Sequence, residues 1–134
     1  MQLNGSCLCG SVSFTISGKL EKFYLCHCHY CQKDSGSAHA ANLFFSAAEL
    51  EWQCGLEQVK QFQLMGTHHM KSFCGVCGSA IPSKQPNIHS VVVPAGCIDG
   101  QLNQLPDAHL FNASKAQWET QAATIPRFEF LPEY

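Results

Sequence analysis

The distribution of apolar positions along the chain predicts a structure built mainly from β-strands. Apolar residues alternate with small polar ones over 12–16, the pattern of a half-buried strand, and this strand is predicted to end at Gly18. Three consecutive valines predict a buried strand over 90–94. Four other short apolar stretches predict further strands, at 23–25, 38–45, 59–65 and 71–73.

Helix signals are weak by comparison. Ser46 is placed to cap a short helical turn, with Glu49 at its third helical position. A second turn is predicted over 114–118. No linker, repeat or low-complexity segment divides the chain, so we expect a single domain over residues 1–134, mainly β, with loops held by metal.

Composition narrows the function classes. The 134 residues are 46% hydrophobic, which supports a packed core and excludes a disordered chain. Only 13% are charged, about half of the usual ~25%. The formal net charge is −2 and no basic stripe is visible, so nucleic acid is not an expected partner. No apolar run approaches the ~20 residues of a membrane span. The first nine residues do not resemble an export signal, so we expect a cytoplasmic protein.

The cysteines carry most of the functional information. Nine are present, an odd number that does not suit a disulfide framework. Seven of them are separated from another cysteine by only one or two residues, a spacing that suits a metal better than disulfide bridges. The clusters are Cys7 with Cys9, Cys26 with Cys28 and Cys31, and Cys74 with Cys77.

These seven thiols divide most simply into a set of four and a set of three. The two pairs, Cys7/Cys9 and Cys74/Cys77, make a closed four-thiolate site of the kind that holds structural zinc. Iron is an alternative occupant, because four thiolates suit either metal. The triplet of Cys26, Cys28 and Cys31 supplies three ligands, which leaves a position for water or substrate on a second, more labile zinc. Such an open site is typical of catalysis.

Two other interpretations of the triplet stay open from the sequence. His27 or His29 could complete a closed site of three cysteines and one histidine, with a purely structural role. Cys28 and Cys31 could instead form a redox-active dithiol without metal.

The remaining cysteines and histidines are given less specific roles. Cys54 and Cys97 are interpreted as small buried hydrophobic residues. His39 follows the triplet closely enough to line its site, whereas the position of His109 relative to the clusters does not follow from the sequence. The other histidines are expected at the surface or in ordinary hydrogen bonds: His68, His69 and His89.

Four short segments form a recognisable set. They are GSCLCGSV at 5–12, CHCHYC at 26–31 with Ser-Gly at 35–36, FCGVCGS at 73–79, and HLF, SKA and Trp over 109–118. In this order and spacing the chain resembles, over nearly its whole length, the glutathione-dependent formaldehyde-activating enzymes, a family that includes the domain of centromere protein V.

The resemblance implies a fold, a metal content and an activity. It implies a β-tent of small twisted sheets, a structural zinc on Cys7, Cys9, Cys74 and Cys77, and a second zinc on Cys26, Cys28 and Cys31. The activity it implies is addition of glutathione to formaldehyde, catalysed by a carbon–sulfur lyase. A free thiol has a pKa of about 8.5, so a zinc ion that binds and deprotonates it would supply the nucleophile. His27 could tune that metal from a neighbouring position.

One departure from the family concerns the substrate. Gln32 stands where the family often has arginine, and glutamine cannot hold a carboxylate in a two-pronged ionic contact. Lys33 is the sequence candidate for supplying the missing charge. We therefore carry two hypotheses: an enzyme acting on a small thiol and an aldehyde, and a non-catalytic zinc module for protein interaction. An apolar patch without a pocket beside the triplet would favour the module.

Overall fold

The computed structural model describes residues 1–132 and is mainly β, as predicted. The strands are β1 (Gln2–Ser6), β2 (Ser13–Cys26), β3 (Ala40–Cys54), β4 (Val59–Gln63), β5 (Met70–Cys74), β6 (Ala80–Ile81), β7 (Ser83–Gln85), β8 (Ser90–Pro94) and β9 (Ala108–Leu110). One α-helix, α1 (His29–Ser35), lies between β2 and β3. Short 3-10 turns cover Leu56–Gln58, Ala95–Cys97, Asn112–Ser114, Gln117–Glu119 and Ala122–Thr124.

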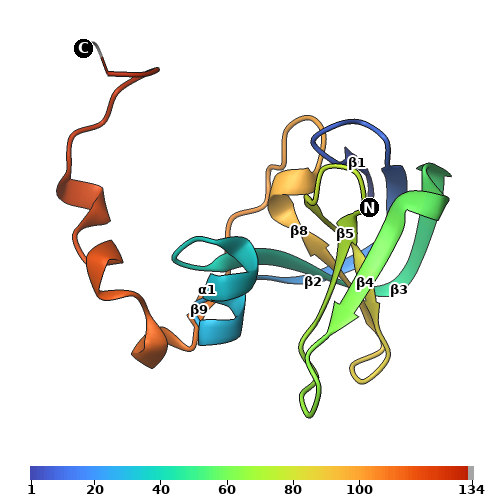
Figure 1. Ribbon diagram of the computed structural model, residues 1–134, viewed down its shortest axis with the longest axis horizontal. Helices are drawn as coiled ribbons and strands as arrows, with labels where there is room; N and C mark the ends of the chain where they lie inside the picture. Colours follow the sequence, from blue (N-terminus) through green and yellow to red (C-terminus); the bar gives the residue numbers. More distant parts are fainter. Residues whose placement is uncertain (133–134) are drawn as a thin grey trace.

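The strands form two sheets, in which every pair of strands is antiparallel except β2 and β9 (Figure 1). The larger has the order β1-β2-β3-β8-β7, and the smaller has the order β4-β5-β6. Two strands pair along one edge of the long strand β2. β1 pairs antiparallel with the first part of β2, and β9 pairs parallel with its last residues. This second pairing brings a segment from near the C-terminus to the end of β2, where the cysteine triplet begins. None of the helices in residues 1–132 is both long and apolar enough to cross a membrane.

The predicted end of a strand at Gly18 is wrong. β2 continues through Gly18 to Cys26, so the two stretches predicted at 12–16 and 23–25 belong to one strand. Gly18 has a φ of +144°, and the β2–β3 register shifts beside it. Glycine therefore permits a bulge in the strand here and does not end it.

The helical turn predicted after Ser46 is also wrong. β3 runs through this position, and Ser46 donates its hydroxyl hydrogen bond across the sheet to the Glu21 carboxylate. Long cross-strand pairing with β2 outweighs the local capping signal. The strands predicted at 59–65, 71–73 and 90–94 are confirmed as β4, β5 and β8. The turn predicted over 114–118 falls across two 3-10 turns, Asn112–Ser114 and Gln117–Glu119.

Two hydrophobic clusters hold the sheets. The larger packs side chains from β2, β3 and β8, the most buried being Phe14, Ile16, Leu43, Phe45 and Val93. The smaller contains Val12 and Ile81 together with Cys7 and Cys74, two of the four cysteines expected to form the closed thiolate site. The alternation of the predicted strands thus places one face of the large sheet in the core.

Gly5 in β1 lies too close to the core to accept a side chain. A Cβ atom there would stand 2.2 Å from Cζ of Phe14 and 2.5 Å from the carbonyl oxygen of Cys97. We expect Gly5→Ala to lower the free energy of unfolding by about 1–3 kcal/mol, because a packed aromatic ring and backbone must move. Urea unfolding measures the effect. Gly96→Ala is the matched control, since no atom lies within 4 Å of the added Cβ; equal stability of the two variants would contradict the packing argument.

Candidate metal centres and the adjoining pocket

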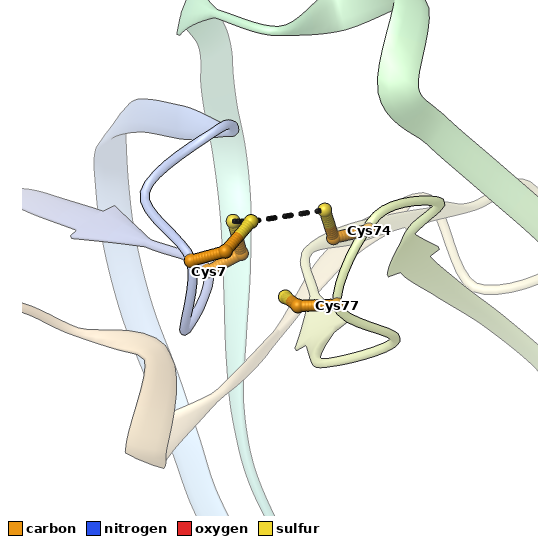
Figure 2. A group of neighbouring side chains, drawn as sticks. Cys7, Cys74 and Cys77 are labelled. Atoms are coloured by element: carbon orange, nitrogen blue, oxygen red, sulfur yellow. Dashed lines mark hydrogen bonds between the residues drawn. The ribbon is translucent and has the colours of Figure 1, made fainter.

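The first thiol group joins two loops that are distant in the sequence. Cys7 and Cys9 follow β1, whereas Cys74 ends β5 and Cys77 lies in the turn before β6. Figure 2 shows Cys7 facing Cys74 and Cys77 across the gap between these loops. The Sγ atoms lie within 4.8 Å of one another, with 3.6 Å between Cys7 and Cys9 and 3.9 Å between Cys9 and Cys74. Tetrahedral zinc with zinc–sulfur bonds of ~2.3 Å requires the sulfur atoms to lie ~3.8 Å from one another, so this group can hold a zinc ion.

Hydrogen-bond donors around the first group favour thiolates. The backbone N–H of Val12 donates to Sγ of Cys7 at 3.2 Å, and that of Val76 donates to Sγ of Cys74 at 3.4 Å. Hydrogen bonding to Ser79 lowers the pKa of Cys77 to about 5. Burial raises the pKa of Cys7, and a bound divalent cation would favour its thiolate form. The donor set therefore suits a metal better than free thiols.

The second thiol group is built at the start of α1. Cys26 is the last residue of β2, Cys28 is the N-cap of α1 and Cys31 lies in its first turn. The backbone N–H of Cys31 donates to Sγ of Cys28 at 3.3 Å. The sulfurs lie within 4.8 Å of one another, and among residues 1–132 no histidine belongs to the group. The geometry therefore does not support the closed site of three cysteines and one histidine.

The helix α1 was not expected from the sequence, although its end signals are present. Cys28 is extended and caps the helix with its sulfur, and Gly36 ends it in a left-handed conformation with φ of +69°. Cysteine is not among the usual capping residues, which hid the N-terminal signal. The helix matters because it turns Cys31 toward Cys26 and Cys28.

The three thiols of the second group differ in their ease of ionisation. Burial raises the pKa of Cys31 and also that of Cys26. For Cys28 burial acts in the same direction, but hydrogen bonds led by the Cys31 backbone N–H outweigh it and lower the pKa. Cys28 is thus easier to ionise than Cys26 or Cys31, and a divalent cation would favour the thiolate form of all three.

A pocket opens beside the second group. Its volume is about 360 Å³, within the range of small-molecule sites. Cys31 and His39 line it from the α1 side, as the sequence predicted for His39, and Ser72 lines it from β5. The pocket lies between the two sheets, so no single segment of the sequence outlines it.

Charged side chains from both sides meet on the pocket wall. Asp34 of α1 forms an ion pair with Lys71 of β5, and its other carboxylate oxygen lies 2.9 Å from Nε2 of His69. All three side chains are only 20–27% exposed. The ring of Tyr30 packs against His69, with 5.6 Å between their centroids. The pocket therefore presents both signs of charge near Cys31.

Comparison with known proteins now identifies the family. The sequence profile of the family described as "Glutathione-dependent formaldehyde-activating enzyme" matches residues 2–114. This chain belongs to that family. A Halomonas elongata protein named "Putative glutathione-dependent formaldehyde-activating enzyme" is 32% identical over 126 residues, covering 88% of this chain and 80% of its own. The crystal structure of a Rhodobacter sphaeroides protein matches with a TM-score of 0.55 and 21% identity, over 78% of this chain and 98% of its own; this likeness concerns the fold.

Gln32, at the position where the sequence departs from the formaldehyde-activating family, has a structural role. Its amide nitrogen donates to the carbonyl oxygen of His27 at 2.7 Å and to that of Ser114 at 2.9 Å, which ties the C-terminal segment to the triplet. Lys33 is exposed and does not line the pocket. The cation on the pocket wall is instead Lys71, which was not singled out from the sequence. Lys71 is separated from α1 by more than thirty residues, and only the approach of β5 brings it there.

The lone cysteines have different environments. Cys97 is buried in the larger core cluster, as expected. The same prediction for Cys54 is wrong, because Cys54 is exposed at the end of β3, where the chain turns at Gly55. Neither is part of a metal-compatible group among the described residues.

The histidines also differ in their environments. His69 is hydrogen-bonded, as expected, but its place on the pocket wall was missed. His89 is exposed, and His68 is exposed at the rim of the pocket. His27 is only 1% exposed, so it is a core residue, and its Nε2 lies 2.7 Å from Nδ1 of His109. The pairing of β9 with β2 brings His109 to this position.

Proposed function

We propose that the protein is a zinc-dependent carbon–sulfur lyase that joins a small, glutathione-like thiol to an aldehyde, or releases the two from their adduct. One observation carries the proposal: the group of three thiols, which has no fourth side-chain ligand among residues 1–132, adjoins a pocket of about 360 Å³ through Cys31. Membership of the formaldehyde-activating family supports the same class of substrates. The four-thiolate group is proposed as the structural zinc site, on Cys7, Cys9, Cys74 and Cys77.

The second zinc is proposed on Cys26, Cys28 and Cys31. When bound there, it supplies an open position for the substrate thiol and lowers the pKa of that thiol. The protein's own residues hold the thiol and aldehyde together. Asp34 and Lys71 offer opposite charges to a thiol that carries both ammonium and carboxylate groups. Such a thiol would bind with its sulfur toward Cys31 and its charged groups toward Asp34 of α1 and Lys71 of β5.

The proposed reaction is the nucleophilic addition of a thiol to a carbonyl group. The substrate sulfur forms a bond to the carbonyl carbon, and the electron pair of the carbon–oxygen π bond moves to the oxygen. The thiol proton leaves to solvent, and the oxygen takes a proton in return. The pocket contributes by holding both reactants in contact, which turns a bimolecular step into one within a complex. We place the protein in the cytoplasm, where thiols stay reduced.

The alternative of a non-catalytic zinc module is less well supported. It predicts an apolar surface without a pocket beside the triplet. Here the triplet adjoins a pocket with a paired carboxylate and ammonium on its wall, through Asp34 and Lys71. Such paired charges are typical of a site for a polar small molecule and are depleted at the core of protein interfaces.

The direct test counts zinc and follows turnover together. Native mass spectrometry of the reduced protein should show two zinc ions per chain and a complex with added glutathione. Exchange between free glutathione and its formaldehyde adduct, followed by NMR, should exceed the spontaneous rate. One firmly bound zinc, no glutathione complex and no acceleration would contradict the proposal and favour the interaction module.

Lys71 should determine how well a charged thiol binds. We expect Lys71→Met to raise KM for glutathione by about tenfold or more, because a contact with a charged group contributes ~1.5–3 kcal/mol. The kcat should change little, since Lys71 acts on the distant end of the thiol. KM for an uncharged thiol such as 2-mercaptoethanol should hardly change.

Lys60→Met provides the matched control for this prediction. Lys60 lies on β4, is exposed, and does not line the pocket. Steady-state kinetics on both variants give the comparison. Equal KM values for glutathione in the two variants would show that Lys71 does not contact the substrate.

A further inference from the structure

Three side chains outside the thiol groups meet beside the triplet. They are His27 between β2 and α1, His39 just before β3, and Glu119 in the 3-10 turn Gln117–Glu119. One ring nitrogen of each histidine and one carboxylate oxygen all lie within 4.8 Å of one another. The rings of His27 and His39 are 5.2 Å apart, tilted by 60°. Side chains alternate along an extended chain, so His27 points away from Cys26 and Cys28.

Two imidazole nitrogens in this group are buried without a partner. Nδ1 of His27 and Nδ1 of His39 have no hydrogen-bond partner among the described residues, although both atoms are shielded from solvent. His27 is 1% exposed, and its other nitrogen is already engaged with His109 at 2.7 Å. A buried polar atom left unpaired costs about 1–3 kcal/mol. Two such atoms in a group that also contains a carboxylate therefore call for an additional partner.

The hydrogen bond to His109 prepares His27 as a ligand. Between two neutral imidazoles one nitrogen donates and the other accepts. When Nε2–H of His27 donates to Nδ1 of His109, Nδ1 of His27 carries a lone pair that points away from that contact. Metal-binding histidines commonly donate their second N–H to a partner in this manner, which fixes the ring and its tautomer. His109 is thus a positioning residue for His27.

We propose that His27, His39 and Glu119 form a third metal site, which binds a divalent transition-metal cation through two imidazole nitrogens and one carboxylate. The site is distinct from the two thiolate groups and goes beyond the proposed lyase function. Its nitrogen and oxygen donors select Zn²⁺, Co²⁺, Ni²⁺ or Fe²⁺ over Mg²⁺ and Ca²⁺. Bonds of ~2.0–2.2 Å require the donors to draw slightly closer, which rotation of the half-buried Glu119 side chain provides.

The third site would attach the C-terminal segment to the catalytic side of the fold. Beyond β9 this segment extends away from the two sheets in short 3-10 turns, and most of its described residues are exposed (Figure 1). Gln32 holds it at Ser114, and Glu119 would add a second attachment five residues later. Since His39 also lines the pocket beside Cys31, cation binding would stiffen one pocket wall.

Cobalt titration of the full chain, with both thiolate groups already filled with zinc, tests the third site. We expect one further Co²⁺ per chain by calorimetry and native mass spectrometry. Its absorption spectrum should lack the intense sulfur-to-cobalt charge-transfer bands that binding to thiolates produces. Hydrogen exchange in the backbone of 112–124 should slow when Co²⁺ binds. Absence of a further Co²⁺, or charge-transfer bands with stoichiometric binding, would overturn the proposal.

Two ligand variants and two controls assign the residues. Glu119→Gln and His39→Gln should each weaken the affinity for the further Co²⁺ by at least ~10-fold, while zinc at the thiolate groups is retained. Glu129→Gln and His89→Gln remove the same functional groups at exposed positions and should bind as the unmodified chain does. Circular dichroism checks the fold of each variant. If one of the two ligand variants unfolds, the Co²⁺ affinity of the other ligand variant tests the assignment. Unchanged Co²⁺ affinity in a folded ligand variant would overturn the assignment. These results do not depend on whether the thiolate triplet is catalytic.

Discussion

Replacement of Cys74 with serine is expected to leave the protein unfolded at physiological temperature. Its melting curve should therefore show no cooperative unfolding transition. Cys74 is fully buried, and its sulfur belongs to the group that joins the loop after β1 to the β5–β6 turn. Structural zinc contributes ~10–16 kcal/mol to small domains, which equals or exceeds the ~5–15 kcal/mol net stability of a typical domain. Loss of one of four ligands should therefore remove most of the stability.

Circular dichroism melting and a zinc count on the same sample measure this effect. Chelation of the unmodified protein should reproduce it, because both treatments empty the same site. Cys54→Ser is the matched control: Cys54 is exposed and outside both thiol groups, so its stability should stay within ~0.5 kcal/mol of the unmodified chain. A Cys74→Ser protein that keeps its zinc and its melting temperature would contradict a structural role for this group.

Cys28→Ser is expected to have the opposite profile, with activity lost and the fold retained. Turnover should fall by ~100-fold or more, because the open metal site proposed on the triplet would lose one of its three protein ligands. The fold should survive because Cys28 is the N-cap of α1, and serine is a preferred residue at that position. Cys28 is also partly exposed, so the substitution leaves no large cavity in the core.

The kinetic and structural readouts separate the possible outcomes for Cys28→Ser. Native mass spectrometry should show one zinc per chain in place of two, and circular dichroism should match the unmodified protein. Cys54→Ser again serves as the control and should keep full activity and both zinc ions. An unfolded Cys28→Ser protein would mean that the triplet stabilises the fold, and full turnover would mean that the reaction takes place elsewhere.

The sequence predicted the strands that carry a clear local pattern. The strands β4, β5 and β8 could be located because their apolar residues and flanking turns are consecutive. The lengths of β2 and β3 could not, because Gly18 and Ser46 carry local signals for an end and a turn. Pairing between the two strands overrides both signals, and a bulge absorbs the irregularity.

The two thiol groups could also be predicted from the sequence. Cys26, Cys28 and Cys31 lie within six residues, so their spacing already restricts them to one ligand set. The Cys7/Cys9 and Cys74/Cys77 pairs are far apart, yet counting the ligands of tetrahedral zinc was enough to join them. The sequence by itself therefore determined the mainly β fold class, the family resemblance and the two thiol groups.

Only the tertiary structure decided what surrounds those groups. The approach of β5 to α1 places Lys71 and His69 in the pocket with Asp34, and the pairing of β9 with β2 places His109 against His27. The meeting of His39 with Glu119 depends on the path of the C-terminal segment. Contacts between residues this distant depend on how the sheets pack and where the chain returns. A local pattern of side chains carries no information on either, since many arrangements bury the same apolar faces equally well.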